Sequence, residues 1–100
     1  MEKFKLHVYP AANRDLLEVV DYVNEMSPEA AKRTYDTIID KIGSLSRMPQ
    51  RCMLLKNPTL RIKGYRVIKA DRYLVFYVVT GKTVEIRRIL HERREYETIL

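Results

Sequence analysis

A histidine, two arginines and a tyrosine stand close together near the carboxyl end of the chain: His91, Arg93, Arg94 and Tyr96. A histidine can move a proton near neutral pH, and an arginine can bind a phosphate and stabilise developing negative charge. A tyrosine can stack on a base or donate a proton. These residue types can therefore cleave an RNA phosphodiester by activating its 2′-hydroxyl, with His91, Arg93 and Tyr96 as catalytic candidates. In the structural alternative, the arginines pair with nearby glutamates on a charged C-terminal helix.

Most of the excess positive charge lies in residues 47–72. This segment holds eight Lys/Arg against one acidic residue, a net charge of +7, whereas all 100 residues together carry +6. A field of this kind attracts polyanions or an acidic protein partner, although a solvated loop that only keeps the protein in solution is the alternative. Its candidate binding residues are Lys56, Arg61, Lys63, Arg66 and Arg72.

Several common kinds of site are excluded by what the sequence lacks. It contains no Gly-rich phosphate loop, no His-Glu-x-x-His pair, no Gly-x-Ser-x-Gly elbow and no cluster of metal ligands, so we expect neither a metal nor a cofactor. The single Cys52 excludes an internal disulfide and a cysteine-rich zinc site. With no secretory or membrane-spanning run, we expect a cytoplasmic protein without a membrane partner.

The segment Tyr65–His91 predicts the sheet that must position these residues. Short breaks at 70–71 and 80–82 divide it into three strands, and gaps this short allow only antiparallel neighbours. The middle strand, Tyr73–Val79, is apolar or aromatic on both faces, so we expect both to be covered. Alternation in the last strand, Val84–His91, predicts one face with Val84, Ile86, Arg88 and Leu90 and another with Glu85, Arg87, Ile89 and His91.

One strand and two helices are predicted before this meander. Alternation over Phe4–Tyr9 predicts a further strand of the same sheet, which Pro10 ends. We expect a helix over 11–26 whose polar residues, among them Asp15, lie off an apolar stripe of Ala12, Leu16, Val19, Val20, Val23 and Met26. Ser27-Pro28-Glu29 is typical of a helix start. The second helix, over 28–45, packs against the first through Ala31, Tyr35, Ile38, Ile42 and Leu45.

The order of these elements predicts a single α+β domain over residues 1–100. An antiparallel helical hairpin follows the first strand and covers one face of the sheet, because its connection is very short. Residues 47–63 are the least regular part, with turn residues at Pro49, Asn57 and Pro58. The layout is β-α-α-β-β-β, with an optional short helix after the last strand.

Taken together, these segments resemble the RelE/ParE family of type II toxin–antitoxin toxins. The resemblance is carried by Asp15-Leu16-x-x-Val19-x-Asp21-Tyr22-Val23, Ala30 to Leu45 ending in Ser46-Arg47-Met48-Pro49, Gly64-Tyr65-Arg66-Val67, and Tyr73–Val79 followed by Val84-Glu85-Ile86-x-Arg88-Ile89-Leu90-His91-x-Arg93-Arg94. It covers nearly the whole chain in order. It implies a growth-inhibiting toxin and a cognate antitoxin whose acidic, amphipathic tail is disordered alone and orders on the toxin.

Members of this family act in two ways. RelE-like members cleave mRNA in the ribosomal A site with basic residues, an arginine that opens the middle strand, and a late Arg, His or Tyr. In this chain Tyr73 stands at that opening and Arg72, one place earlier, is expected on the other side of the sheet, while His91 and Arg93 match late positions. ParE-like members lack the full ribonuclease set and poison DNA gyrase.

The departure at Tyr73 favours the ParE-like side of the family. On either side, Tyr73 and Arg94 join the basic residues as candidates for contacting the target, which is DNA gyrase or ribosome-bound mRNA. An RelE-like mRNA endonuclease is the first alternative function. A non-toxic protein-binding module is the second.

Overall fold

A four-stranded mixed sheet forms the centre of the molecule. The computed structural model describes residues 3–100. The strand order is β1-β4-β3-β2, in which β1 (Lys5–Val8) lies parallel to β4 (Thr83–His91) at one edge. β2 (Tyr65–Ala70) and β3 (Tyr73–Thr80) complete an antiparallel meander with β4. The predicted α+β fold and the place of the N-terminal strand in the sheet are thus confirmed.

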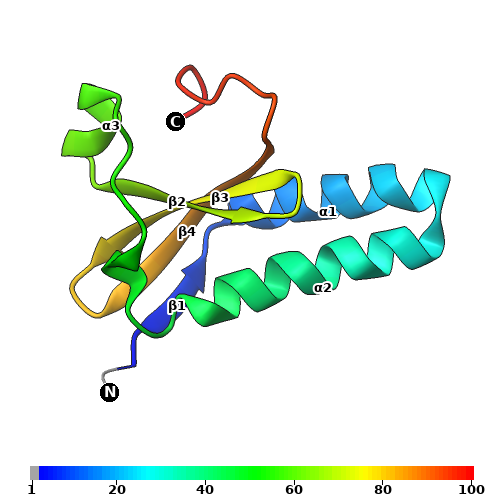
Figure 1. The fold of residues 1–100 in the computed structure, drawn as a ribbon, viewed down its shortest axis with the longest axis horizontal. Coiled ribbons are helices and arrows are strands. Elements are labelled where there is room, and N and C mark those ends of the chain that lie inside the picture. The colour runs from blue at the N-terminus through cyan, green and yellow to red at the C-terminus, as the bar shows by residue number, and fades with distance from the viewer. Residues whose placement is uncertain (1–2) are drawn as a thin grey trace.

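The helical hairpin consists of α1 (Pro10–Met26) and α2 (Pro28–Ser44) and extends beyond the sheet (Figure 1). The predicted start of α2 is confirmed, because the Ser27 Oγ accepts a hydrogen bond from the Ala30 N–H at 3.2 Å and Pro28 takes the first helical position. Two predicted core positions are wrong. Met26 and Tyr35 are exposed, whereas Thr34 of α2 is buried.

Both faces of the sheet are covered, as the apolar middle strand predicts. Facing the helices, a core cluster includes Leu16, Ile38, Val75 and Tyr77. On the opposite face a second cluster gathers around the fully buried Phe76 and includes Leu55, Leu60, Tyr65, Val78 and Leu90. In Figure 1, α3 (Pro58–Ile62) and the C-terminal segment lie above the sheet, whereas α2 runs below it.

A bulge in β4 overturns the strict alternation predicted for this strand. Phe76 pairs with Arg88 but the next residue, Tyr77, pairs with Ile86, so Arg87 is an extra residue in β4. An extra residue reverses the side on which every later side chain lies. Ile89 therefore joins the helix-side core, and Leu90 joins the opposite cluster.

The segment between α2 and β2 is more ordered than its composition predicts. It contains a 3₁₀ turn, η1 (Pro49–Arg51), and the short helix α3, which Asn57 caps by accepting from the Leu60 N–H at 3.1 Å. The buried Tyr77 hydroxyl donates to the Pro49 carbonyl at 2.6 Å and ties η1 to the sheet. Residues 92–100 form turns, so the optional C-terminal helix is not formed.

Candidate functional site

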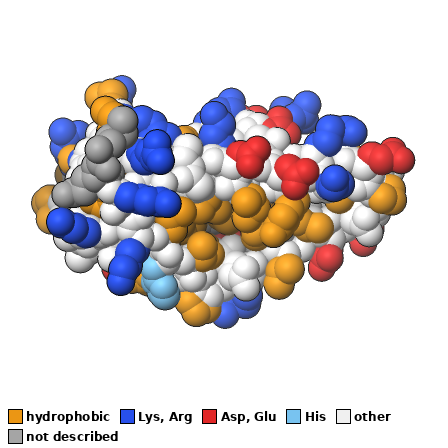
Figure 2. Space-filling view, turned by 90° about the horizontal axis from the view of Figure 1, so that it is seen from below, with side chains coloured by type: hydrophobic (Ala, Val, Ile, Leu, Met, Phe, Trp, Pro, Cys, Tyr) orange, Lys and Arg blue, Asp and Glu red, His pale blue; other side chains and the backbone are white. Residues whose placement is uncertain are grey.

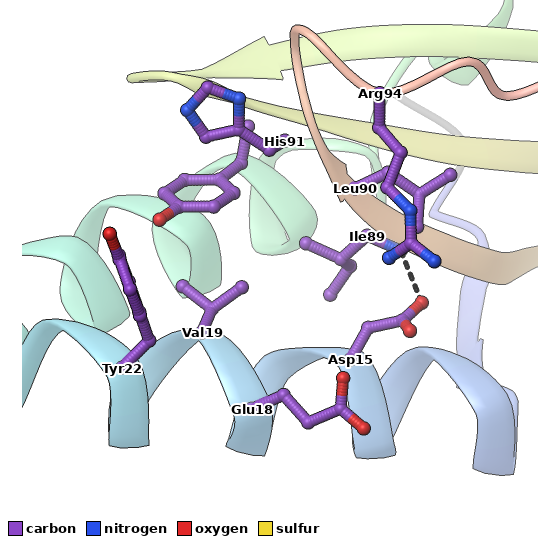
Figure 3. Close-up of a pocket in the computed structure, with 9 residues that line it drawn as sticks. Asp15, Glu18, Val19, Tyr22, Ile89, Leu90, His91 and Arg94 are labelled. Carbon is purple, nitrogen blue, oxygen red and sulfur yellow. Dashed lines mark hydrogen bonds between the residues drawn. The ribbon is translucent and has the colours of Figure 1, made fainter.

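A pocket of about 450 Å³ lies between α1 and the carboxyl end of β4. Its floor is apolar, from Val19 and Ile89, and His91 borders it from the last position of β4. Three predicted site residues line it: Tyr73, His91 and Arg94. Glu18 and Tyr22 of α1 also line it, and in Figure 3 Tyr22 points away from the helix across the pocket, whereas Glu18 lies along α1 beside Asp15.

Asp15 holds α1 against the bulge of β4. Its carboxylate accepts two hydrogen bonds from the Arg88 guanidinium, at 2.7 and 2.9 Å. It accepts a third from the Ile89 backbone N–H at 2.9 Å, and the dashed line in Figure 3 marks this third hydrogen bond. The hydrogen bond to Asp15 raises the pKa of Arg88 above its ordinary value. The expectation that Asp15 lies off the packed side of the helix is wrong, because this side chain is buried.

Sequence reasoning missed three polar residues of the pocket, and a signal for them existed. Asp15, Glu18 and Tyr22 are separated by three and four positions, which places them on one face of a helix. Asp15 and Tyr22 also belong to the segment that carries the family resemblance. Acidic and aromatic residues at helical spacing are therefore typical of a functional face of a helix as well as of a face that only contacts solvent.

Tyr73 and His91 form one wall of the pocket. They are partners in the β3–β4 ladder, and their rings meet edge to face with centroids 5.4 Å apart. Burial raises the pKa of the Tyr73 hydroxyl, and Asp71 and Tyr22 act in the same direction. The phenol therefore stays protonated at neutral pH and is not available as a base.

Tyr96 lies on the other face of the sheet from His91. Its ring packs on Phe76 with centroids 4.9 Å apart, within the second cluster, whereas His91 points to the helix side. Arg93 stays exposed, and its backbone N–H donates to the His91 Nδ1 at 3.2 Å. The structure thus keeps His91 and Arg93 adjacent in the turn but separates Tyr96 from both.

The basic candidates fall into two groups at opposite ends of β2. Lys56, Arg61 and Lys63 are exposed around α3, before the strand begins. Arg72 lies in the turn after the strand, next to Tyr73 and the C-terminal arginines, rather than on a face of the sheet as expected. A six-residue strand is about 20 Å long. The two groups therefore contact one target only if that target is extended.

Arg66 has a structural role. One of its terminal nitrogens donates to the carbonyls of Gln50 and Cys52, so the side chain fixes the loop after η1 against β2. On the face shown in Figure 2, Lys and Arg side chains lie both at the sheet end and along the helical hairpin, whereas the acidic side chains lie mostly over the hairpin. In residues 3–100, no helix is long and apolar enough to cross a bilayer.

A group of charged and aromatic side chains around Arg87 gives a testable pH dependence of stability. Arg87 lies over the Tyr9 ring, 4.7 Å from its centroid, and forms an ion pair with Glu85 at 2.8 Å. The hydrogen bond from Arg87 lowers the pKa of the Glu85 carboxyl. Because the folded-state pKa is depressed, this pair stabilises the protein above the unfolded pKa of about 4.3 and the stabilisation is lost as the pH falls through the folded value.

We expect Glu85→Gln to lower the free energy of unfolding by up to about 1 kcal/mol at pH 7, since the pair is only partly buried. At pH 3 the difference between the two proteins should be smaller, because protonation of Glu85 as the pH falls through its lowered folded-state pKa removes the charge from the wild type. Urea unfolding at the two pH values measures this. An equal loss at pH 3 would mean that packing, and not the charge of Glu85, is responsible.

Residues 6–96 match the family model described as ParE toxin of type II toxin–antitoxin system, parDE. Among solved structures, the chain is similar to one from the chromosomal ParDE system of P. aeruginosa, with 22% identity, a TM-score of 0.74, and coverage of 91% of this chain and 98% of that one.

It is also similar to one from the RelBE2 toxin–antitoxin complex of Mycobacterium tuberculosis, with 23% identity, a TM-score of 0.64, and coverage of 89% and 98%. None of the curated proteins matches the chain. At these identities the solved structures establish the fold alone. The family match spans nearly the whole chain, so the protein belongs to the ParE toxin family of type II toxin–antitoxin systems.

Proposed function

We propose that this chain inhibits growth by acting on DNA gyrase and that it works in the cytoplasm. Family membership supports the toxin class, and the position of Tyr96 supports the choice of target. A ribonuclease that uses His91, Arg93 and Tyr96 needs these side chains around one phosphodiester. Tyr96 instead packs on Phe76, on the face of the sheet away from His91. This separation is the observation on which the gyrase proposal depends.

The second part of the proposal is a cognate antitoxin with an acidic, amphipathic tail. Exposed cations around α3 and in the turns after β2 and β4 suit such a tail electrostatically. The two similar structures come from toxin–antitoxin systems, which supports a partner of this kind here. The tail would order on the toxin as it binds.

Expression of the chain without its antitoxin tests the proposed function. We expect growth to stop and DNA damage to appear, while the ends of cellular mRNAs remain unchanged. His91→Ala and Arg93→Ala should retain full toxicity, because neither residue has a catalytic role in this proposal. Growth curves, a DNA-damage reporter and mapping of mRNA 5′ ends are the measurements.

Two results would contradict this proposal. New mRNA ends that disappear in His91→Ala or Arg93→Ala would identify an RelE-like endonuclease. Unchanged growth at a verified level of folded protein would identify a non-toxic binding module.

A further inference from the structure

We propose that the pocket between α1 and the end of β4 binds one apolar side chain of an acidic peptide segment, supplied by the protein that neutralises this toxin. The inference rests on the proposed function, because it locates the contact that the cognate antitoxin makes.

The lining of the pocket suits an apolar anchor. Val19 and Ile89 form the floor, and the rings of Tyr22, Tyr73 and His91 stand around it. A volume of about 450 Å³ is within the range of pockets that bury most of a bound group and leaves room for a leucine or phenylalanine side chain with its backbone. Apolar floors ringed by aromatic side chains are where interfaces place their strongest contacts.

Tyr22 is largely exposed although it lines the pocket. Its side chain is 63% exposed, although Tyr73, its neighbour across the pocket, is only 8% exposed. Tyr35 of α2 is exposed to a comparable extent, 44%, and does not line the pocket. A partner that fills the pocket would cover the ring of Tyr22 and gain its apolar area, and Tyr35 provides a matched comparison.

Arginines lie on the side of the pocket that is formed by the turn after β4. Arg94 lines it, and Arg72 lies beside the same turn, because the Glu92 N–H donates to the Arg72 carbonyl at 2.8 Å. Within residues 3–100, Arg72, Arg93 and Arg94 form no ion pair, whereas Glu92 is already paired with Lys69 at 3.0 Å. Three arginines without carboxylate partners favour an occupant that carries acidic residues next to its anchor.

The opposite wall distinguishes a peptide from a nucleic acid. Glu18 lines the pocket, has no hydrogen bond or ion pair among residues 3–100, and would repel a phosphate backbone. Asp15, the second carboxylate of this wall, is satisfied by Arg88 and Ile89. A peptide can turn a backbone N–H toward Glu18 and its own carboxylates toward the arginines. A nucleic acid has negative charge at every nucleotide and cannot avoid Glu18 in this way.

Binding of the purified product of the adjacent reading frame to the full chain tests this proposal. We expect Tyr22→Ala and Arg94→Glu each to raise the Kd about tenfold or more. Tyr22→Ala removes an aromatic ring from the lining of the pocket, and Arg94→Glu replaces a basic side chain of the lining with an acidic one. The controls Tyr35→Ala and Arg33→Glu make the same chemical changes on α2 and should alter the Kd by less than about twofold. Circular dichroism checks that all four variants are folded.

The outcomes separate this proposal from the proposed function. Equal Kd values for pocket and control variants would overturn the pocket while the toxicity of the wild type stands. A wild type that neither binds this protein nor inhibits growth would overturn both. A single-stranded RNA 12-mer serves as a second probe. If Tyr22→Ala abolished its binding and left the protein partner unaffected, a nucleic acid would be the occupant and the peptide proposal would fall.

Discussion

Asp15→Ala is expected to lower the free energy of unfolding by about 3 kcal/mol. Removing one partner of a buried ion pair usually costs about 3–5 kcal/mol, because the other charge is left without compensation. Here the Ile89 N–H loses its acceptor as well. We expect the lower end of this range, since the Arg88 side chain remains 26% exposed and can turn toward water.

Denaturant unfolding of wild type, Asp15→Ala and Asp21→Ala measures this difference. Asp21 is an exposed acidic residue of the same helix, so its replacement should change stability by no more than about 0.5 kcal/mol. The loss in Asp15→Ala is a large fraction of the 5–15 kcal/mol that holds a typical domain folded. Equal stability of the two variants would show that the Asp15 carboxylate does not support the bulge.

Phe76→Ala is expected to cost about 3–5 kcal/mol and to loosen the C-terminal segment. Phe76 is fully buried and carries the ring of Tyr96, so a cavity at this position removes the surface on which the segment packs. Trypsin should then cleave after Arg93 and Arg94 faster than in the wild type, at denaturant concentrations well below the global unfolding transition.

Two variants control for this effect. Tyr35→Ala, at an exposed aromatic residue of α2, should change neither stability nor cleavage by much. Tyr96→Ala should increase cleavage with a smaller loss of stability, because Tyr96 is only partly buried. If Phe76→Ala lost stability but left cleavage at Arg93 and Arg94 unchanged below the transition, the C-terminal segment would not depend on the second cluster.

Periodicity predicted the elements of this fold but not the bulge. The sheet, the hairpin and the covered faces of β3 follow from local patterns of apolar residues, which is why they could be predicted. A bulge depends on which residues of β3 and β4 pair, and no pattern within β4 shows that Arg87 is extra. The faces of Ile89, Leu90 and His91 were therefore assigned from an alternation that the bulge interrupts.

The candidate site was only partly predictable for a related reason. Asp15 and Arg88 are 73 positions apart, so the burial of Asp15 could be seen only once α1 was packed on β4. Tyr96 is close to His91 in sequence, but the turn after β4 carries it to the other face. Basic residues that form one run in the sequence are divided by the length of β2.

The most direct test of the gyrase account is supercoiling of relaxed plasmid DNA by purified gyrase in the presence of this protein. We predict inhibition that rises with the concentration of the toxin, that is retained in His91→Ala, and that is relieved by the cognate antitoxin. Full supercoiling at a large molar excess of folded toxin, with cleavage of ribosome-bound mRNA by the same preparation, would contradict it.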